Sequence, residues 1–246
     1  MPEPRSNHAK RGSSGDVGRD LVAITEGEVN FFWSFIQGSL VNPETWNRLL
    51  HSYGFCERHA WIHMSIEMAF RDEYLLGPTI LYGALIEKAL SALRIVPRIG
   101  GYSIERRLRP DDACLLCKLN IKEAPPGACS KNRLDRGRST HRLQTFAFDL
   151  EPLWSSRVCD SCRDQDGGSK NSTISCRKHL LADMRTRRRI DLSRQQDSLQ
   201  ELYALLMRYQ KSFLAAGRAA SDHERAALIA AIGWCSGWRP LLYLCR

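Results

Sequence analysis

The stretch CDSCRDQDGGSKNSTISCRKH, residues 159–179, contains two pairs of candidate metal ligands, Cys159/Cys162 and Cys176/His179. A two-residue gap lets both side chains of a pair converge from a tight turn or from the first turn of a helix, and a second such pair completes a tetrahedral zinc site. The 13 residues from 163 to 175 separate the pairs, which is close to the spacing of common zinc modules. The stretch predicts a local zinc site that organises this part of the chain.

Two further pairs with the same gap come earlier, Cys56/His59 and Cys114/Cys117. They supply the ligands for a second site, although residues 60–113 lie between them. Ligand count equally allows an interleaved arrangement, in which the first pair shares an ion with the third and the second with the fourth. The four pairs predict one or two zinc ions, with an iron–sulfur cluster as the alternative that the histidines disfavour.

Buried free cysteine is the competing interpretation of any single pair, because cysteine packs well as a small hydrophobe. Four pairs with one spacing, two of them with histidine in the same slot, favour metal ligation. Cys129, Cys235 and Cys245 stand outside the pairs. The last two lie among apolar residues, where we expect core positions.

The composition is that of a folded protein, with 246 residues, 43% hydrophobic and 26% charged. A chain of this length can bury a core without disulfides. We find no apolar run long enough to span a membrane, and the polar start does not resemble a signal peptide. The sequence thus predicts a cytoplasmic protein, in whose reducing surroundings nine cysteines point to metal binding.

Helix signals dominate the first third. Thr25 with Glu28 forms a capping-box pattern, and Asn42 followed by Pro43 gives an N-cap before a helix-starting proline. Apolar residues at three-and-four spacing continue through the segments that follow, as far as Leu93. These residues predict short antiparallel helices.

The C-terminal part returns to helix, with a heptad seam over 199–213 and a capping box at Ser221 and Glu224. No strand series is found. We expect an all-α fold of short antiparallel helices with a loop-rich zinc-binding middle segment and a C-terminal helical hairpin. The expected parts are a flexible leader (1–20), an N-terminal helical part (21–96), a cysteine-rich zinc-binding segment (97–180) and the hairpin (181–246), with one compact domain from residue 21 on.

An open, catalytic metal site is one alternative. Cys56, His59 and His63 can supply three ligands while Glu67 acts as base, because the last three of these residues recur one helical turn apart. The favoured interpretation is that His63 and Glu67 lie on the polar side of this helix. Common enzyme motifs such as a Walker loop or HExxH are absent, so an enzyme is the less favoured hypothesis.

The net charge of +9 and an isoelectric point near 9.2 favour anionic partners. Arg185, Arg187, Arg188 and Arg189 follow the last ligand pair closely and can contact nucleic acid or an acidic protein. Another basic stretch covers 131–142, and the alternative for both stretches is a solvated surface. A third functional hypothesis is a redox or metal sensor, in which thiolate oxidation releases zinc.

Three short motifs resemble an uncharacterised bacterial family of helical proteins that carry CPxC and G-[FL]-C-x-x-H elements. They are GFCERHA at 54–60, CLLC at 114–117 and SCRKHL at 175–180. The resemblance implies helices and zinc, and it implies no particular activity.

The chain also departs from that family pattern. Leu115 replaces the proline of CPxC, a CxxC expected before Gly54 is absent, and Cys159/Cys162 is an additional pair. In comparison with the family, Cys56 therefore has other partners or none.

Overall fold

The computed structural model describes residues 23–38, 42–94, 101–123, 129–163, 174–186, 192–214 and 218–245, and these residues form helices and no strands. The predicted all-α fold is confirmed. The expected leader, 1–20, lies outside the described residues. The helices are α2 (Glu26–Ile36), α3 (Pro43–His51), α4 (Glu57–Arg71), α5 (Leu76–Leu93), α6 (Gly101–Leu108), α7 (Leu115–Lys118), η3 (Ile121–Glu123), α8 (Lys131–Arg138), α9 (His141–Asp149), α10 (Glu151–Trp154), η4 (Ser155–Arg157), α11 (Asp160–Arg163), α12 (Arg177–Arg185), α13 (Leu192–Leu214), α14 (Asp222–Ser236) and α15 (Arg239–Leu244).

The predicted helix starts occur where the sequence places them. Both bonds of the capping box form at Thr25 and again at Ser221. The Asn42 side chain accepts hydrogen bonds from the amides of Glu44 and Thr45, at 3.0 and 3.1 Å. Each cap satisfies helix amides that would otherwise have no partner, and this fixes where the chain enters the helix.

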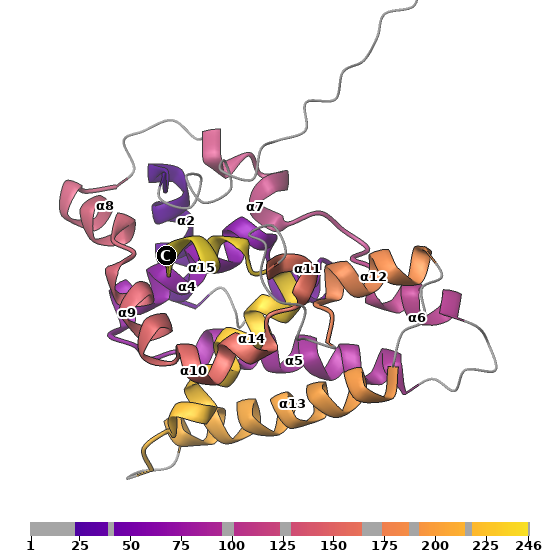
Figure 1. Ribbon diagram of the computed structural model, residues 1–246. Coiled ribbons are helices and arrows are strands. Elements are labelled where there is room, and N and C mark those ends of the chain that lie inside the picture. The colour runs from indigo at the N-terminus through magenta and orange to yellow at the C-terminus, as the bar shows by residue number, and fades with distance from the viewer. Residues whose placement is uncertain are drawn as a thin grey trace, which may run out of the picture.

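Helix α13 lies along α5 at one side of the molecule, and α14 packs against both (Figure 1). The apolar seam of α13 faces this core, since Leu199, Leu202, Leu206 and Tyr209 are all buried. The seam is thus part of the intramolecular core. None of the helices in the described part of the chain combines the length and apolarity that a membrane crossing requires.

Helix α4 runs through the middle of the protein, in contact with α2, α8, α9, α14 and α15 (Figure 1). Every side chain from His59 to Ala69 is buried as a result. The interpretation that His63 and Glu67 occupy a polar, solvated side is therefore wrong. The His63 ring lies among three phenylalanine rings, with centroids 5.2–5.3 Å away, because neighbouring helices cover α4 all round.

The basic stretch at 131–142 forms α8 and the start of α9, which pack against α2 and α4. Its arginines are engaged with the protein. Arg136 and Arg138 donate hydrogen bonds to the carbonyls of Ala69 and Ile24, at 2.6 and 3.0 Å, and the Arg133 guanidinium lies over the Trp33 ring. These side chains attach α8 to the core, while Arg136 and Arg138 remain exposed to solvent.

Candidate metal centres

All four ligand pairs have one construction. Cys56, Cys114 and Cys176 are the N-cap residues of α4, α7 and α12, and Cys159 directly precedes α11. The second ligand of each pair follows three residues later, in the first helical turn. The free amides and the positive end of the dipole at a helix N-terminus stabilise thiolates, which are the form of cysteine that binds metal.

The structure brings the first two pairs together as cluster 1, formed by Cys56, His59, Cys114 and Cys117. The Nδ1 atom of His59 lies 3.2, 3.5 and 3.4 Å from the sulfurs of Cys56, Cys114 and Cys117, in that order. The sulfurs of Cys56 and Cys117 are 3.8 Å apart. His59 and Cys114 are buried, whereas Cys117 is exposed, so the cluster lies at the edge of the core.

The other two pairs form cluster 2, made of Cys159, Cys162, Cys176 and His179. Its Nδ1 atom, on His179, lies 3.2, 3.4 and 3.3 Å from the three sulfurs in chain order. The sulfurs of Cys162 and Cys176 are 3.8 Å apart, and all three cysteines are buried. Of the two arrangements that ligand count allows, the geometry is therefore the sequential one.

These separations fit the edges of a zinc-centred tetrahedron. With Zn–S near 2.3 Å and Zn–N near 2.05 Å, tetrahedral angles place two sulfurs about 3.8 Å apart and a sulfur and a nitrogen about 3.6 Å apart. The observed sulfur pairs match the first value, and the sulfur–nitrogen pairs, at 3.2–3.5 Å, are slightly shorter than the second. Both clusters can hold a metal ion of this size with shifts of a few tenths of an ångström.

Glu28 supports cluster 1 from α2. Its buried carboxylate lies 3.0 Å from Nε2 of His59, the ring nitrogen opposite the one that faces the sulfurs. The same carboxylate pairs with Arg58 and closes the capping box on Thr25. A carboxylate in this position fixes the ring orientation and the tautomer of a ligating histidine, leaving Nδ1 free for metal.

Helix α14 positions both histidine-containing pairs. The hydroxyl of Ser236 donates to the carbonyl of Phe55, directly before Cys56, at 3.1 Å. The indole of Trp234 donates to the carbonyl of Ser175, directly before Cys176, also at 3.1 Å. Thus one helix fixes the chain immediately ahead of a ligand in each cluster.

Gln195 of α13 strengthens the second of these attachments. Its side-chain amide exchanges two hydrogen bonds with the backbone of Ser175, at 3.0 and 3.1 Å, and it is buried. Sequence reasoning missed Gln195, Ser236 and Trp234, because nothing in their local sequence relates them to the ligands. Glu28 was recognised only as a capping residue.

The thiols of each cluster are close enough to share protons. The hydrogen bond with Cys56 lowers the pKa of Cys114 to about 3 and raises the pKa of Cys56. In cluster 2, hydrogen bonding to Cys159 raises the pKa of His179 to about 10, and the bond with Cys162 lowers the pKa of Cys159 far below its ordinary value. Each cluster thus stabilises a thiolate, and metal binding displaces the protons that remain.

His63 does not belong to cluster 1. Its Nε2 lies 3.6 Å from the Glu67 carboxylate, beyond hydrogen-bonding distance, and neither ring nitrogen has a hydrogen-bond partner among the described residues. The structure therefore does not join Cys56, His59 and His63 into the open, three-ligand arrangement that the catalytic alternative requires.

Of the basic residues proposed to contact a partner, Arg185 ends α12, where its Nε donates to Glu105 of α6 at 2.9 Å. Arg187, Arg188 and Arg189 lie outside the described residues.

Comparison with known proteins gave no match to a family model, to a curated protein or to a solved structure.

Proposed function

We propose that each cluster binds one zinc ion and that both ions are structural. The observation that carries this proposal is the pair of complete donor sets, each with three sulfurs and one imidazole nitrogen at tetrahedral separations. Four protein ligands leave no position for water or substrate, which distinguishes a structural zinc site from a catalytic one.

Zinc would replace core packing where the helices are short. Helices α7 and α11 contain four residues each, too few to be stable through their own hydrogen bonds. Cluster 1 would attach α7 to the start of the buried helix α4, and cluster 2 would attach α11 to α12. The free energy of metal binding would then contribute directly to folding.

The donor geometry disfavours an iron–sulfur cluster. The donor atoms of each set lie within 4.8 Å of one another, which suits a single ion at their centre. A cluster of several irons and sulfides needs its protein ligands further apart, and cysteine alone is its usual ligand.

Elemental analysis of anaerobically purified protein tests the proposal. We expect two zinc ions per chain in the unaltered protein and one in each of the variants Cys56→Ser and Cys159→Ser, with a loss of helicity in circular dichroism. Cys129→Ser is the matched control, since Cys129 belongs to neither cluster, and it should keep both ions. Stoichiometric iron, or no loss of zinc in the two ligand variants, would contradict the proposal.

We propose in addition that the zinc-stabilised scaffold binds nucleic acid through the basic region at the end of α12. The contact of α12 with α6 supports this, because it brings Arg185 next to a helix that carries Arg106 and Arg107. Arg187 and Arg188 follow in the sequence. Phosphates attract such a concentration of arginines in a salt-dependent manner.

Fluorescence anisotropy with a labelled single-stranded oligonucleotide over a salt series tests this partner. Arg187→Gln/Arg188→Gln should weaken binding and lower the slope of log K against log salt by about 0.7 per lost contact. Arg208→Gln/Lys211→Gln removes the same charge from an exposed part of α13 and should change neither quantity. Equal behaviour of the two double variants would exclude the proposed region.

A further inference from the structure

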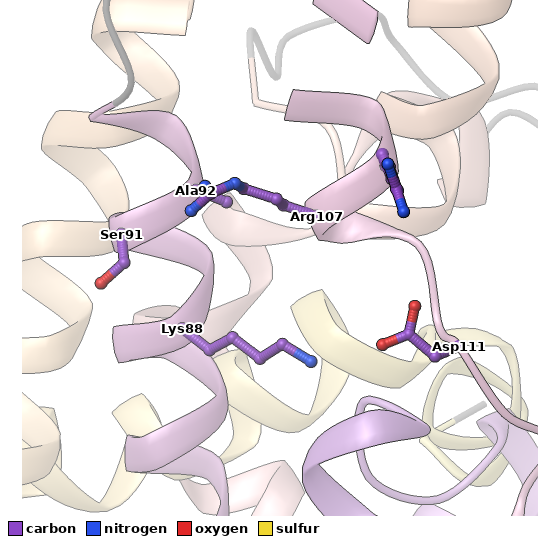
Figure 2. Close-up of a pocket in the computed structure, with 6 residues that line it drawn as sticks. Lys88, Ser91, Ala92, Arg107 and Asp111 are labelled. Atoms are coloured by element: carbon purple, nitrogen blue, oxygen red, sulfur yellow. The ribbon is translucent and has the colours of Figure 1, made fainter. Parts of the chain in front are cut away.

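A pocket of about 640 Å³ opens between α5 and α6, and none of its lining residues belongs to either metal cluster. Figure 2 shows Lys88 extending from α5 toward Asp111 and Arg107 extending from α6 toward Ala92, so the two cations enter the space from different walls. The lining residues are Lys88, Ser91, Ala92, Arg106, Arg107 and Asp111. This volume is typical of a small-molecule site.

Lys88 is held in a fixed position. Its Nζ donates to the carbonyl of Leu50 at 2.7 Å and lies 4.4 Å from the centroid of the Tyr53 ring. An ammonium has three donors, so two N–H groups remain for a ligand. Partial burial removes part of the hydration of the ammonium group and thereby lowers the pKa of Lys88. An anion in the pocket would compensate for that loss.

Tyr53 positions a second lining residue. Its hydroxyl donates to the main-chain carbonyl of Arg107 at 3.0 Å, and the ring is completely buried. The guanidinium of Arg177 lies on the same ring, 4.5 Å from its centroid. A single rigid side chain therefore connects both walls of the pocket, and it reduces the ordering that a ligand would otherwise impose.

The charges of the pocket are unbalanced. Three cations line it, on Lys88, Arg106 and Arg107, against the single carboxylate of Asp111. That carboxylate also contacts the ring of His51, with Nδ1 and Oδ2 3.2 Å apart. Among the residues that the structure describes, none forms an ion pair with either arginine of the pocket. Their guanidinium donors are available to a ligand.

We propose that this pocket binds the phosphate group of a small phosphorylated molecule. Guanidinium groups match phosphate oxygens with two parallel hydrogen bonds, and an ammonium adds a point charge. Ser91 and Asp111 would serve the hydroxyl or amino groups of the remainder of the ligand. The site goes beyond structural zinc. It shares Arg106 and Arg107 with the region proposed to bind nucleic acid, whereas Lys88, Ser91 and Asp111 belong to the pocket alone.

Isothermal titration calorimetry on zinc-loaded protein tests the proposal with three probes: inorganic phosphate, adenosine monophosphate and adenosine. We expect phosphate and adenosine monophosphate to bind. Adenosine lacks the phosphate and should bind at least about 10 times more weakly than the nucleotide, which corresponds to the loss of about one charge-assisted hydrogen bond. Lys88→Gln and Arg107→Gln should each lower the affinity about 10- to 100-fold. Arg208→Gln, which removes an exposed charge on α13, should change it less than about twofold.

A single-stranded oligonucleotide without a terminal phosphate distinguishes the source of the phosphate. If the oligonucleotide alone binds and Lys88→Gln abolishes that binding, the pocket takes a backbone phosphate and the small-molecule assignment is overturned. If no phosphate-containing probe binds, or if the pocket variants bind as tightly as Arg208→Gln, the site itself is refuted. Zinc content and circular dichroism of each variant separate these outcomes from failure of the metal centres.

Discussion

Replacing Glu28 by glutamine is expected to weaken zinc binding at cluster 1 while leaving cluster 2 unchanged. The variant preserves the shape of the side chain and removes its charge. It thereby loses the charge-assisted contact with buried His59, at 3.0 Å, and the partly buried ion pair with Arg58. Loss of such a supporting carboxylate reduces metal affinity about 10- to 100-fold, equivalent to about 1.4–2.7 kcal/mol.

Competition with a chromophoric chelator measures this effect. Zinc should leave the variant in two steps. The step for cluster 1 should occur at a lower chelator concentration than in the unaltered protein, and the step for cluster 2 should occur at the same concentration. Glu224→Gln is a closely matched control. Glu224 is also buried, closes the capping box on Ser221 and pairs with Arg218, and it has no contact with a ligand histidine.

The comparison of the two variants separates support of the metal from helix capping. If Glu28→Gln releases zinc as unaltered protein does, the carboxylate does not support His59 as a metal ligand. If Glu224→Gln weakens zinc binding equally, the effect arises from general loss of stability.

Three further predictions concern the core. Gly233→Ala should destabilise the protein by about 1–3 kcal/mol in urea unfolding, because the added methyl would overlap the indole ring of Trp238; unchanged stability would show that the ring can move aside. Burial raises the pKa values of the Cys235 and Cys245 thiols to about 12 and 11, so both are protonated at pH 8. Iodoacetamide should therefore label them slowly in mass spectrometry until the protein unfolds, and rapid labelling of native protein would contradict this. His63→Leu should retain two zinc ions per chain in elemental analysis, whereas loss of one ion would make His63 a ligand after all.

The helix starts and the ligand pairs were predictable because they are local. Thr25 with Glu28 and Ser221 with Glu224 place side chain and backbone within one turn, so the sequence alone determines the capping geometry. Cys176 and His179 are likewise three residues apart, so a single helical turn brings their side chains together.

The partner of the Cys56/His59 pair was not predictable from the sequence, since it depends on tertiary contacts, whereas the Cys159/Cys162 and Cys176/His179 pairs lie close together in the chain. Cys56 meets Cys117 only because α4 and α7 are brought together by the rest of the fold. The contact of Glu28 with His59 depends equally on the packing of α2 against α4. Sequence periodicity gives no register between helices that lie far apart in the chain.

The burial of His63 and Glu67 illustrates a second limit. Charge and polarity usually mark the solvated side of a helix, and on that basis both residues were assigned to it. Helix α4 is enclosed on all sides, and a central helix retains no solvated side whatever its pattern. Arg136 and Arg138 are exposed, yet their guanidinium groups donate hydrogen bonds to backbone carbonyls of core residues, so an exposed charge can also hold a helix in place.

The four pairs share one sequence spacing, so in an unfolded chain they are interchangeable half-sites for a metal ion. If the clusters bind zinc as proposed, an ion captured by Cys56 and His59 would be coordinated equally well by either CxxC pair, because both pairs have the same spacing. Cys114/Cys117 precedes Cys159/Cys162 in the chain, so during synthesis the native partner would emerge first and this order would favour correct ligation. A chain refolded from denaturant in excess zinc would lose that order, and we expect part of it to be held in a misligated kinetic trap until thiolates exchange at the metal.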